Sequence, residues 1–266
     1  MTLARSTRVA VHAVASAVLA FLVLPILAVV PASFNPVSYL QLPPPGLSLR
    51  WYGAFFRDPE WLTSLSTSLR VALVATVVSL VLGTLAALGL ERTGGPLRKA
   101  VTGLFLAPLI VPVIVTSVAL YQFGQRLGLV GTTAGMALGH TLMCLPFVVI
   151  NVGVSLHGLD PTLVRAAEGL GASTWHAFRT VTLPLILPGV TGGAVFAFIT
   201  SFDEVVISIF LAGVRAKTMP VKMWEVIRIE ITPVVAVAST LFILLTVLLF
   251  VLVRRVGGRV GELVHP

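Results

Sequence analysis

Charged residues are scarce in this sequence: they make up 11% of its 266 positions, against roughly 25% in soluble globular domains. Hydrophobic residues make up 57%. The only cysteine is Cys144, which excludes an internal disulfide and is interpreted as a small buried side chain. The formal charge of +8 comes from few residues, mostly near the ends of apolar runs, and no basic cluster indicates a nucleic-acid surface. The composition therefore predicts a protein that lies almost entirely in a lipid bilayer.

The sequence also lacks the side-chain patterns of an enzyme. Lys217-Thr218 is the only lysine followed by Ser or Thr, and Ala216 stands where a phosphate-binding loop requires glycine. No set of His, Cys and Glu has the spacing of a metal site, and no nucleophile stands beside a base. We therefore expect no catalytic residue, no metal and no cofactor in this chain. The chain is therefore not expected to hydrolyse ATP itself.

Six apolar segments have about the 20 residues that a helix needs to cross a bilayer. The first is longer than the ~7–15 apolar residues of a signal peptide, so we expect it to remain as a helix. The expected fold is all-α, integral to the membrane, with one transmembrane domain over residues 1–266. Its six spans are expected at 9–30, 65–90, 100–122, 131–156, 183–211 and 232–253.

Basic residues near the ends of these spans predict their orientation, because cytoplasmic loops carry an excess of Lys and Arg. The residues concerned are Arg5, Arg8, Arg92, Arg98, Lys99, Arg254, Arg255 and Arg259. They place both termini and the segment 157–182 on the cytoplasmic side. A counter-signal comes from four basic residues between 215 and 228. On the external side, 31–64 is expected to form an ordered or interfacial cap, and 212–231 a partly helical segment along the membrane surface.

The polar segment 157–182 predicts two short helices outside the bilayer. Asp160-Pro161 is a favourable helix start, and Gly171 suits a helix end that needs a left-handed residue. Ser173 can cap a second helix that carries Trp175 and Phe178. Two interpretations stay open on spacing alone: an element that docks a partner, or an ordinary connecting loop.

Ala166-Ala167, Gly171-Ala172, Phe178 and Leu183-Pro184 form a motif with a recognisable spacing. It resembles the cytoplasmic EAA loop of binding-protein-dependent ABC importer permeases. Arg165 departs from that family, which has Glu at this position, although Glu168 lies nearby. The resemblance implies that this loop couples the chain to an ATPase. The coupling residues are then Arg165, Ala166, Ala167, Glu168, Gly171, Ala172, Trp175, Phe178, Leu183 and Pro184.

Further motifs resemble the spermidine/putrescine branch of these permeases. They are LSLRWY at 47–52, the run 183–188, SFDEVVIS at 201–208 and TMPV at 218–221. The resemblance implies a type I importer permease in the bacterial inner membrane, surrounded by lipid and working by alternating access. It also implies three kinds of partner: a second permease, identical or different, two ATPase subunits, and a periplasmic substrate-binding protein.

Two acidic residues, Asp203 and Glu204, fall inside the expected fifth span. A charged side chain at the bilayer centre costs about 2.5–3.5 kcal/mol on insertion scales, which favours a functional role. On a continuous helix a polar stripe forms from Thr200, Ser201, Glu204 and Ser208, with Asp203 beside it. One interpretation is a path for a cationic solute such as a protonated polyamine. The other is a structural pair that bonds a neighbouring helix.

Other interpretations remain. The same architecture could carry an amino-phosphonate, an opine-like compound or an organic acid. A membrane enzyme and an independent secondary transporter or channel are less consistent with the motifs. His140 and Asn151, in the expected fourth span, are interpreted as packing or helix-linking residues.

Overall fold

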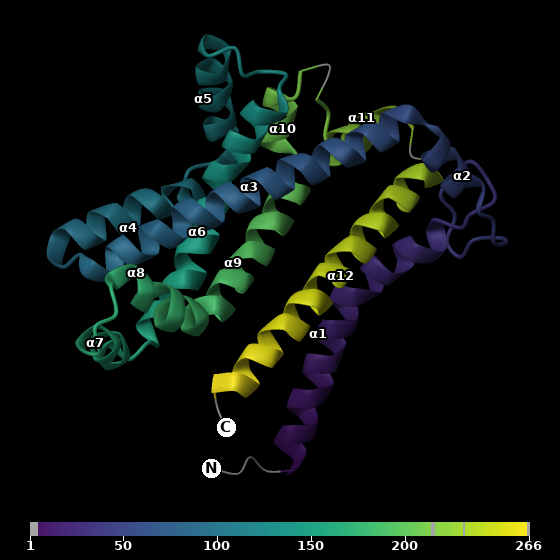
Figure 1. The fold of residues 1–266 in the computed structure, drawn as a ribbon. Coiled ribbons are helices and arrows are strands. Elements are labelled where there is room, and N and C mark those ends of the chain that lie inside the picture. The colour runs from purple at the N-terminus through teal and green to yellow at the C-terminus, as the bar shows by residue number, and fades with distance from the viewer. Residues whose placement is uncertain (1–4, 214–215, 231, 265–266) are drawn as a thin grey trace. The chain divides into compact units, whose positions relative to one another are not determined.

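The structure is a computed structural model that describes residues 5–213, 216–230 and 232–264, with side chains for 9, 11–213, 216–230 and 232–251. All regular structure within these residues is helical (Figure 1). The elements are α1 (Arg5–Ala32), α2 (Arg50–Arg57), α3 (Pro59–Arg92), α4 (Gly95–Ile110), α5 (Val113–Arg126), α6 (Thr133–His157), α7 (Pro161–Gly169), α8 (Thr174–Ala177), the π-helix η1 (Phe178–Thr182), α9 (Leu183–Asp203), α10 (Val206–Leu211), α11 (Met219–Ile229) and α12 (Pro233–Val264).

The chain forms two compact units: residues 1–62 with 223–244, and residues 63–222 with 245–266. Several expected orientation signals lie outside the described side chains, so the orientation stays a prediction. They are Arg5, Arg8, Arg215, Arg254, Arg255 and Arg259.

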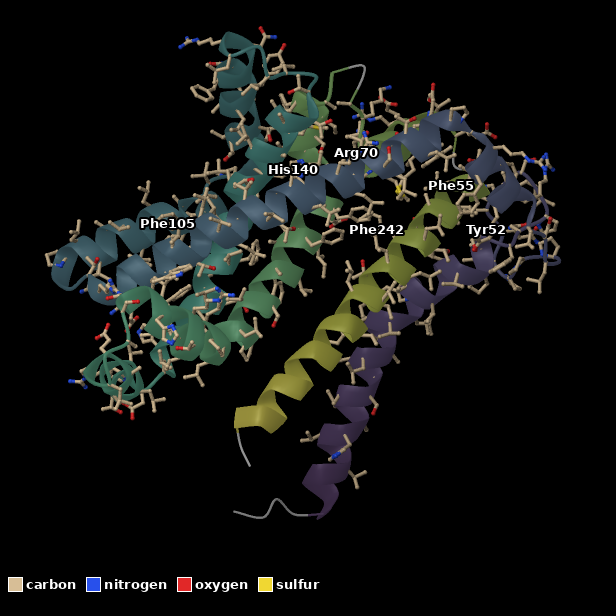
Figure 2. The ribbon with its side chains drawn as sticks, in the orientation of Figure 1. Tyr52, Phe55, Arg70, Phe105, His140 and Phe242 are labelled. Atoms are coloured by element: carbon tan, nitrogen blue, oxygen red, sulfur yellow. The ribbon has the colours of Figure 1, made fainter. Side chains whose placement is uncertain are left out.

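In the first unit, the stretch after α1 is ordered by side-chain hydrogen bonds, as the sequence predicts. The buried Asn35 amide donates to Gln41 O at 3.1 Å and accepts from the Val37 N–H at 3.3 Å. Trp51 Nε1, at the start of α2, donates to Val37 O at 3.1 Å. Phe55, labelled in Figure 2, is fully buried. It packs against Trp61, with ring centroids 5.3 Å apart. This segment is therefore a folded cap, and the side of the membrane on which it lies stays a prediction.

In the second unit, α6 and α9 approach closely because glycines of α9 face the backbone of α6. A Cβ added at Gly193 would lie 3.2 Å from Val148 Cα, and one at Gly189 would lie 2.5 Å from Asn151 O. Helices in lipid gain little from burying apolar surface, so they associate through such close van der Waals contact. Gly83 of α3 faces the side chain of Val148, because a Cβ there would lie 2.7 Å from Val148 Cγ1. Val148 therefore lies at the point where three helices meet.

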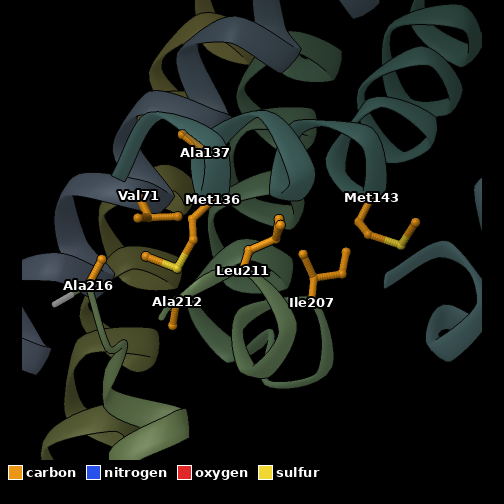
Figure 3. Packing of buried hydrophobic residues seen from close by; sticks show 8 residues of the cluster. All are labelled: Val71, Met136, Ala137, Met143, Ile207, Leu211, Ala212 and Ala216. Atoms are coloured by element: carbon orange, nitrogen blue, oxygen red, sulfur yellow. The ribbon is translucent and has the colours of Figure 1, made fainter. Parts of the chain in front are cut away.

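An apolar cluster joins α3, α6, α10 and the segment after α10 (Figure 3). It contains Val71, Met136, Ala137, Met143, Ile207, Leu211, Ala212 and Ala216. Gly139 of α6 permits this packing, because a Cβ there would lie 2.8 Å from Leu211 Cδ1. Both ends of α6 are thus fixed within the second unit.

Five helices in the described residues are long and apolar enough to cross a membrane. A sixth span exists if α4 and α5 count as one, but these two helices meet at 100°. The expected third span, 100–122, is therefore not one straight helix. The reason is Pro112, which restricts Val111 before it to an extended backbone and lacks an N–H to continue the helix.

Because α6 and α9 are in close contact, one methyl group added between them is expected to destabilise the chain. Gly189→Ala is expected to lower the stability of the chain by about 1–3 kcal/mol, because the new Cβ overlaps Asn151 and Ser155. The measurement is the thermal unfolding midpoint of the purified chain in detergent, followed by tryptophan fluorescence. Gly153→Ala on α6 is the control, because a Cβ there meets nothing within 4 Å. Equal midpoints for the two variants would contradict the packing.

Candidate functional site

The segment expected to couple to a partner begins with a capped helix. The Asp160 carboxylate accepts from the Thr162 N–H at 2.9 Å, at the start of α7. This bond to the charged form lowers the pKa of Asp160 below its ordinary value. Pro161 occupies the first helical position, where its missing N–H costs nothing. The predicted helix start is confirmed.

A left-handed residue joins α7 to α8. Gly171 has φ +91°, a conformation that side chains rarely adopt, and its N–H donates to Glu168 O at 3.0 Å. The Ala172 N–H donates to Ala167 O at 3.1 Å, which closes the end of α7. Ser173 Oγ then accepts from the His176 N–H at 3.2 Å and caps α8. The predicted turn and cap are both confirmed.

The segment presents apolar side chains outward. Trp175 is 68% exposed and stacks on Phe178 with ring centroids 5.4 Å apart, while Leu170 is 91% exposed. Ala177, between the two aromatics, is fully buried and fixes the other face of the segment against the unit. A stacked aromatic pair on a fixed support can fill a partner's pocket at little cost in side-chain entropy.

Arg165, the departure from the family motif, lines a cavity of 1140 Å³ beside this segment. The cavity lies between the last turn of α3, the end of α6 and the segment itself, and Arg92, Trp175 and Phe178 also line it. Of the other predicted coupling residues, Ala167, Ala172 and Leu183 are half-buried. Ala166, Glu168, Gly171 and Pro184 are exposed.

A polar cluster that sequence reasoning missed ties three helix ends together beside this cavity. Glu91 Oε2, at the end of α3, lies 3.3 Å from Arg98 Nη2 of α4 and 3.4 Å from His157 Nδ1 of α6. Arg98 Nη2 also lies 3.0 Å from His157 Nε2. The three residues are 7 to 66 positions apart in sequence, and no short motif connects them.

The acidic pair lies at a break in the expected fifth span. α9 ends at Asp203, Glu204 has an extended backbone at φ −70° and ψ 115°, and α10 begins at Val206. Glu204 Oε1 accepts from the Ile207 N–H at 2.8 Å, which pairs an N–H in the first turn of α10. The continuous helix over 183–211 expected from the sequence is therefore interrupted at these carboxylates.

The break changes how the predicted path residues are arranged. Asp203 is exposed, whereas Glu204 and Thr200 are half-buried. Ser201 and Ser208 are buried and lie on opposite sides of the break, so the five residues do not form one straight stripe. The predicted path residues thus fall into two groups: the more accessible carboxylates Asp203 and Glu204, and the buried hydroxyl groups of Ser201 and Ser208.

His140 bonds both buried serines. Its ring projects from α6 (Figure 2) and is fully buried. Nδ1 lies 2.8 Å from Ser201 Oγ, and Nε2 lies 3.0 Å from Ser208 Oγ. The interpretation of His140 as a helix-linking residue is confirmed. Asn151 donates from its Nδ2 to Phe147 O within its own helix at 2.8 Å.

Comparison with known proteins decides the family. The family model described as "Binding-protein-dependent transport system inner membrane component" matches residues 79–262. The chain belongs to this family. It is a transport permease subunit and a multi-pass inner-membrane protein, and the expected all-α fold of a type I ABC importer permease is confirmed. The alternatives of a membrane enzyme and an independent secondary transporter do not fit this membership.

Similar curated proteins agree over most of the chain. The spermidine/putrescine transport system permease protein PotC of Haemophilus influenzae is 32% identical over 235 residues, which cover 88% of this chain and 91% of that protein. The putrescine transport system permease protein PotI of Escherichia coli is 33% identical over 231 residues, 84% and 82% of the two chains. The molybdenum transport system permease protein ModB of Mycobacterium bovis is 34% identical over 245 residues, 84% and 90%.

Solved structures share the fold. A chain of a bacterial ABC transporter involved in the import of the acidic polysaccharide alginate has a TM-score of 0.75 at 17% identity, and the match covers 96% of this chain and 99% of that chain. A chain of the inward-facing MetNI methionine ABC transporter has a TM-score of 0.60 at 21% identity and covers 83% and 100%.

The turn between α7 and α8 leads to a test of the segment's local stability. Gly171→Ala is expected to destabilise the turn by about 1–2 kcal/mol, because a side chain at this φ approaches the next carbonyl. Hydrogen–deuterium exchange in α7 and α8 should accelerate. Gly169→Ala is the control, since a Cβ there meets nothing within 4 Å. Unchanged exchange in the Gly171 variant would show that the turn tolerates a side chain.

Proposed function

We propose that the chain is one of two permease subunits of an ATP-driven importer for protonated polyamines. The proposal of a polyamine as cargo rests on the pair of carboxylates at the break between α9 and α10. The end of a helix carries roughly −0.5 elementary charge from its unpaired carbonyl groups. At the end of α9 this partial charge adds to the charges of Asp203 and Glu204, while the opposite partial charge at the start of α10 is met by Glu204 Oε1, which accepts from the Ile207 N–H. The net negative charge at the break attracts a cation that passes it and repels an anion.

Sequence identity alone does not choose the cargo. The relatives named for polyamines are 32–33% identical to this chain, and the relative named for molybdenum is 34% identical. The choice therefore rests on the site. An organic acid or an amino-phosphonate brings negative charge to a place that already holds two carboxylates, which disfavours it by like-charge repulsion.

The partners are proposed from the exposed segment α7–η1. One ATPase subunit is expected to receive the stacked Trp175 and Phe178 of this chain. A second ATPase subunit is expected to bind the second permease, which is identical to this chain or different from it. A periplasmic binding protein is expected to deliver the solute on the other side, with both termini of this chain in the cytoplasm. ATP binding then moves the docked segment, and α9 carries this movement to the carboxylates, because α8, η1 and α9 follow one another without a loop. The path thereby alternates between outward and inward access.

Arg165 gives this coupling contact an unusual charge. Its side chain is exposed and lines the same cavity as Arg92, whereas the family motif has a carboxylate at its position. The matching surface of the ATPase is therefore expected to be acidic at this point.

Docking is tested by removing the exposed aromatic. Trp175→Ala should weaken ATPase binding by about thirtyfold and reduce the ATPase recovered with the tagged chain, because a buried interface tryptophan contributes ~2 kcal/mol or more. The measurement is co-purification of the ATPase with the tagged chain from cells of its own source. Trp224→Ala is the matched control, since Trp224 is also exposed but belongs to the first unit. If the chain recovers no ATPase even before mutation, the importer proposal fails.

Cargo is tested at the carboxylates. Asp203→Asn combined with Glu204→Gln should reduce putrescine and spermidine uptake about tenfold or more, which corresponds to ~1.4 kcal/mol of lost attraction. ATPase recovery should not change. Uptake is measured in cells that lack other polyamine importers, and Asp203→Glu is the charge-preserving control. Unchanged polyamine uptake in the neutral variant would contradict the cation path.

A further inference from the structure

The buried ring of His140 connects the two sides of the break that holds the acidic pair. Ser201 lies in the last turn of α9 and Ser208 in the first turn of α10, and His140 of α6 bonds both. A fully buried imidazole among membrane helices needs a partner for each nitrogen, because an unpaired polar group there is costly. Both nitrogens have one. We call His140, Ser201 and Ser208 the histidine clamp.

The directions of the hydrogen bonds in the clamp are fixed by a carbonyl group. Ser208 Oγ lies 3.0 Å from Glu204 O, and since a carbonyl only accepts, the serine hydroxyl donates its proton there. Ser208 must then accept from His140, so the ring carries its proton on Nε2. In a neutral ring with its proton on Nε2, Nδ1 is an acceptor, and the Ser201 hydroxyl then donates to it. The chain of bonds runs in one direction, from Ser201 through His140 and Ser208 to the backbone of Glu204.

The clamp restrains the distance across the break. Two hydrogen bonds of 2.8 and 3.0 Å and the width of one ring keep the two serine Oγ atoms within about 8 Å of each other. One serine belongs to the end of α9 and the other to the start of α10, so the ring of His140 joins the two helix ends that flank Glu204 and Val205.

Glu204 is held both at its backbone carbonyl and at its side-chain carboxylate. Its carbonyl accepts from Ser208, and its Oε1 accepts from the Ile207 N–H. We propose that His140 is a positioning residue of the transport path: it maintains the break between α9 and α10 and so orients the Glu204 carboxylate toward the solute. This inference rests on the proposed cation path, because it concerns the orientation of a carboxylate that the path uses.

The first experiment compares two substitutions in the complete transporter, reconstituted in proteoliposomes with its binding protein. His140→Leu removes both bonds at similar volume and should raise the KM for putrescine about tenfold at equal protein level. His140→Gln keeps one acceptor and one donor and should restore most of the loss. A loss that glutamine does not restore, or one explained by less assembled transporter, would overturn the positioning role.

The second experiment asks whether His140 acts through Glu204. In a Glu204→Gln background, His140→Leu should cause little further loss, because the group that it positions has been neutralised. Fully additive losses would overturn the inference and leave the cation path intact. A Glu204→Gln variant with normal uptake would instead reject the cation path itself, so the two failures are distinguishable.

A spectroscopic readout is independent of transport. Nitrogen NMR of the histidine-labelled chain, with His140→Gln used for assignment among the five histidines, should show a neutral ring protonated on Nε2. Protonation on Nδ1, or on both nitrogens, would contradict the directions of the bonds in the clamp.

Discussion

The packing of α6 against α9 is the contact on which both candidate sites depend. α9 follows directly from the exposed coupling segment and ends at the acidic pair, so its position decides where both lie. Gly189 and Gly193 bring it against the α6 backbone, and His140 of α6 bonds Ser201 close to its end. In lipid such contacts replace the hydrophobic effect, because the surrounding chains are as apolar as the helices. Glycine contacts and a hydrogen-bonded ring therefore determine the geometry.

A break in a transmembrane helix can place charged groups where a solute reaches them. An intact helix pairs its own backbone groups and offers a solute only side chains, whereas a helix end also offers carbonyl groups and a partial charge. The break after Asp203 creates such an end, and Glu204 occupies the gap. The N–H of Ile207 that the break would leave unpaired is satisfied by Glu204 itself. The same carboxylate thus stabilises the interruption and contributes to its charge.

Short-range signals made the coupling segment predictable. Asp160 and Ser173 cap helices through bonds to N–H groups two or three residues away, and Gly171 adopts a left-handed φ that local sterics demand. The all-α membrane fold followed from composition and from the length of the apolar runs. The bend at Pro112 had a local signal as well, since proline restricts the residue before it. The apolar run around it concealed that signal.

The sequence by itself determined the class of protein, its family and the shape of its coupling segment, because these depend on composition, on motif spacing and on bonds between near neighbours. Only the tertiary structure decided that the fifth span breaks at the carboxylates and that His140 joins the two sides of the break. The apolar run 183–211 satisfies a continuous helix equally well. The interruption is held by a ring 61 and 68 residues away in sequence, a distance at which no local pattern carries information.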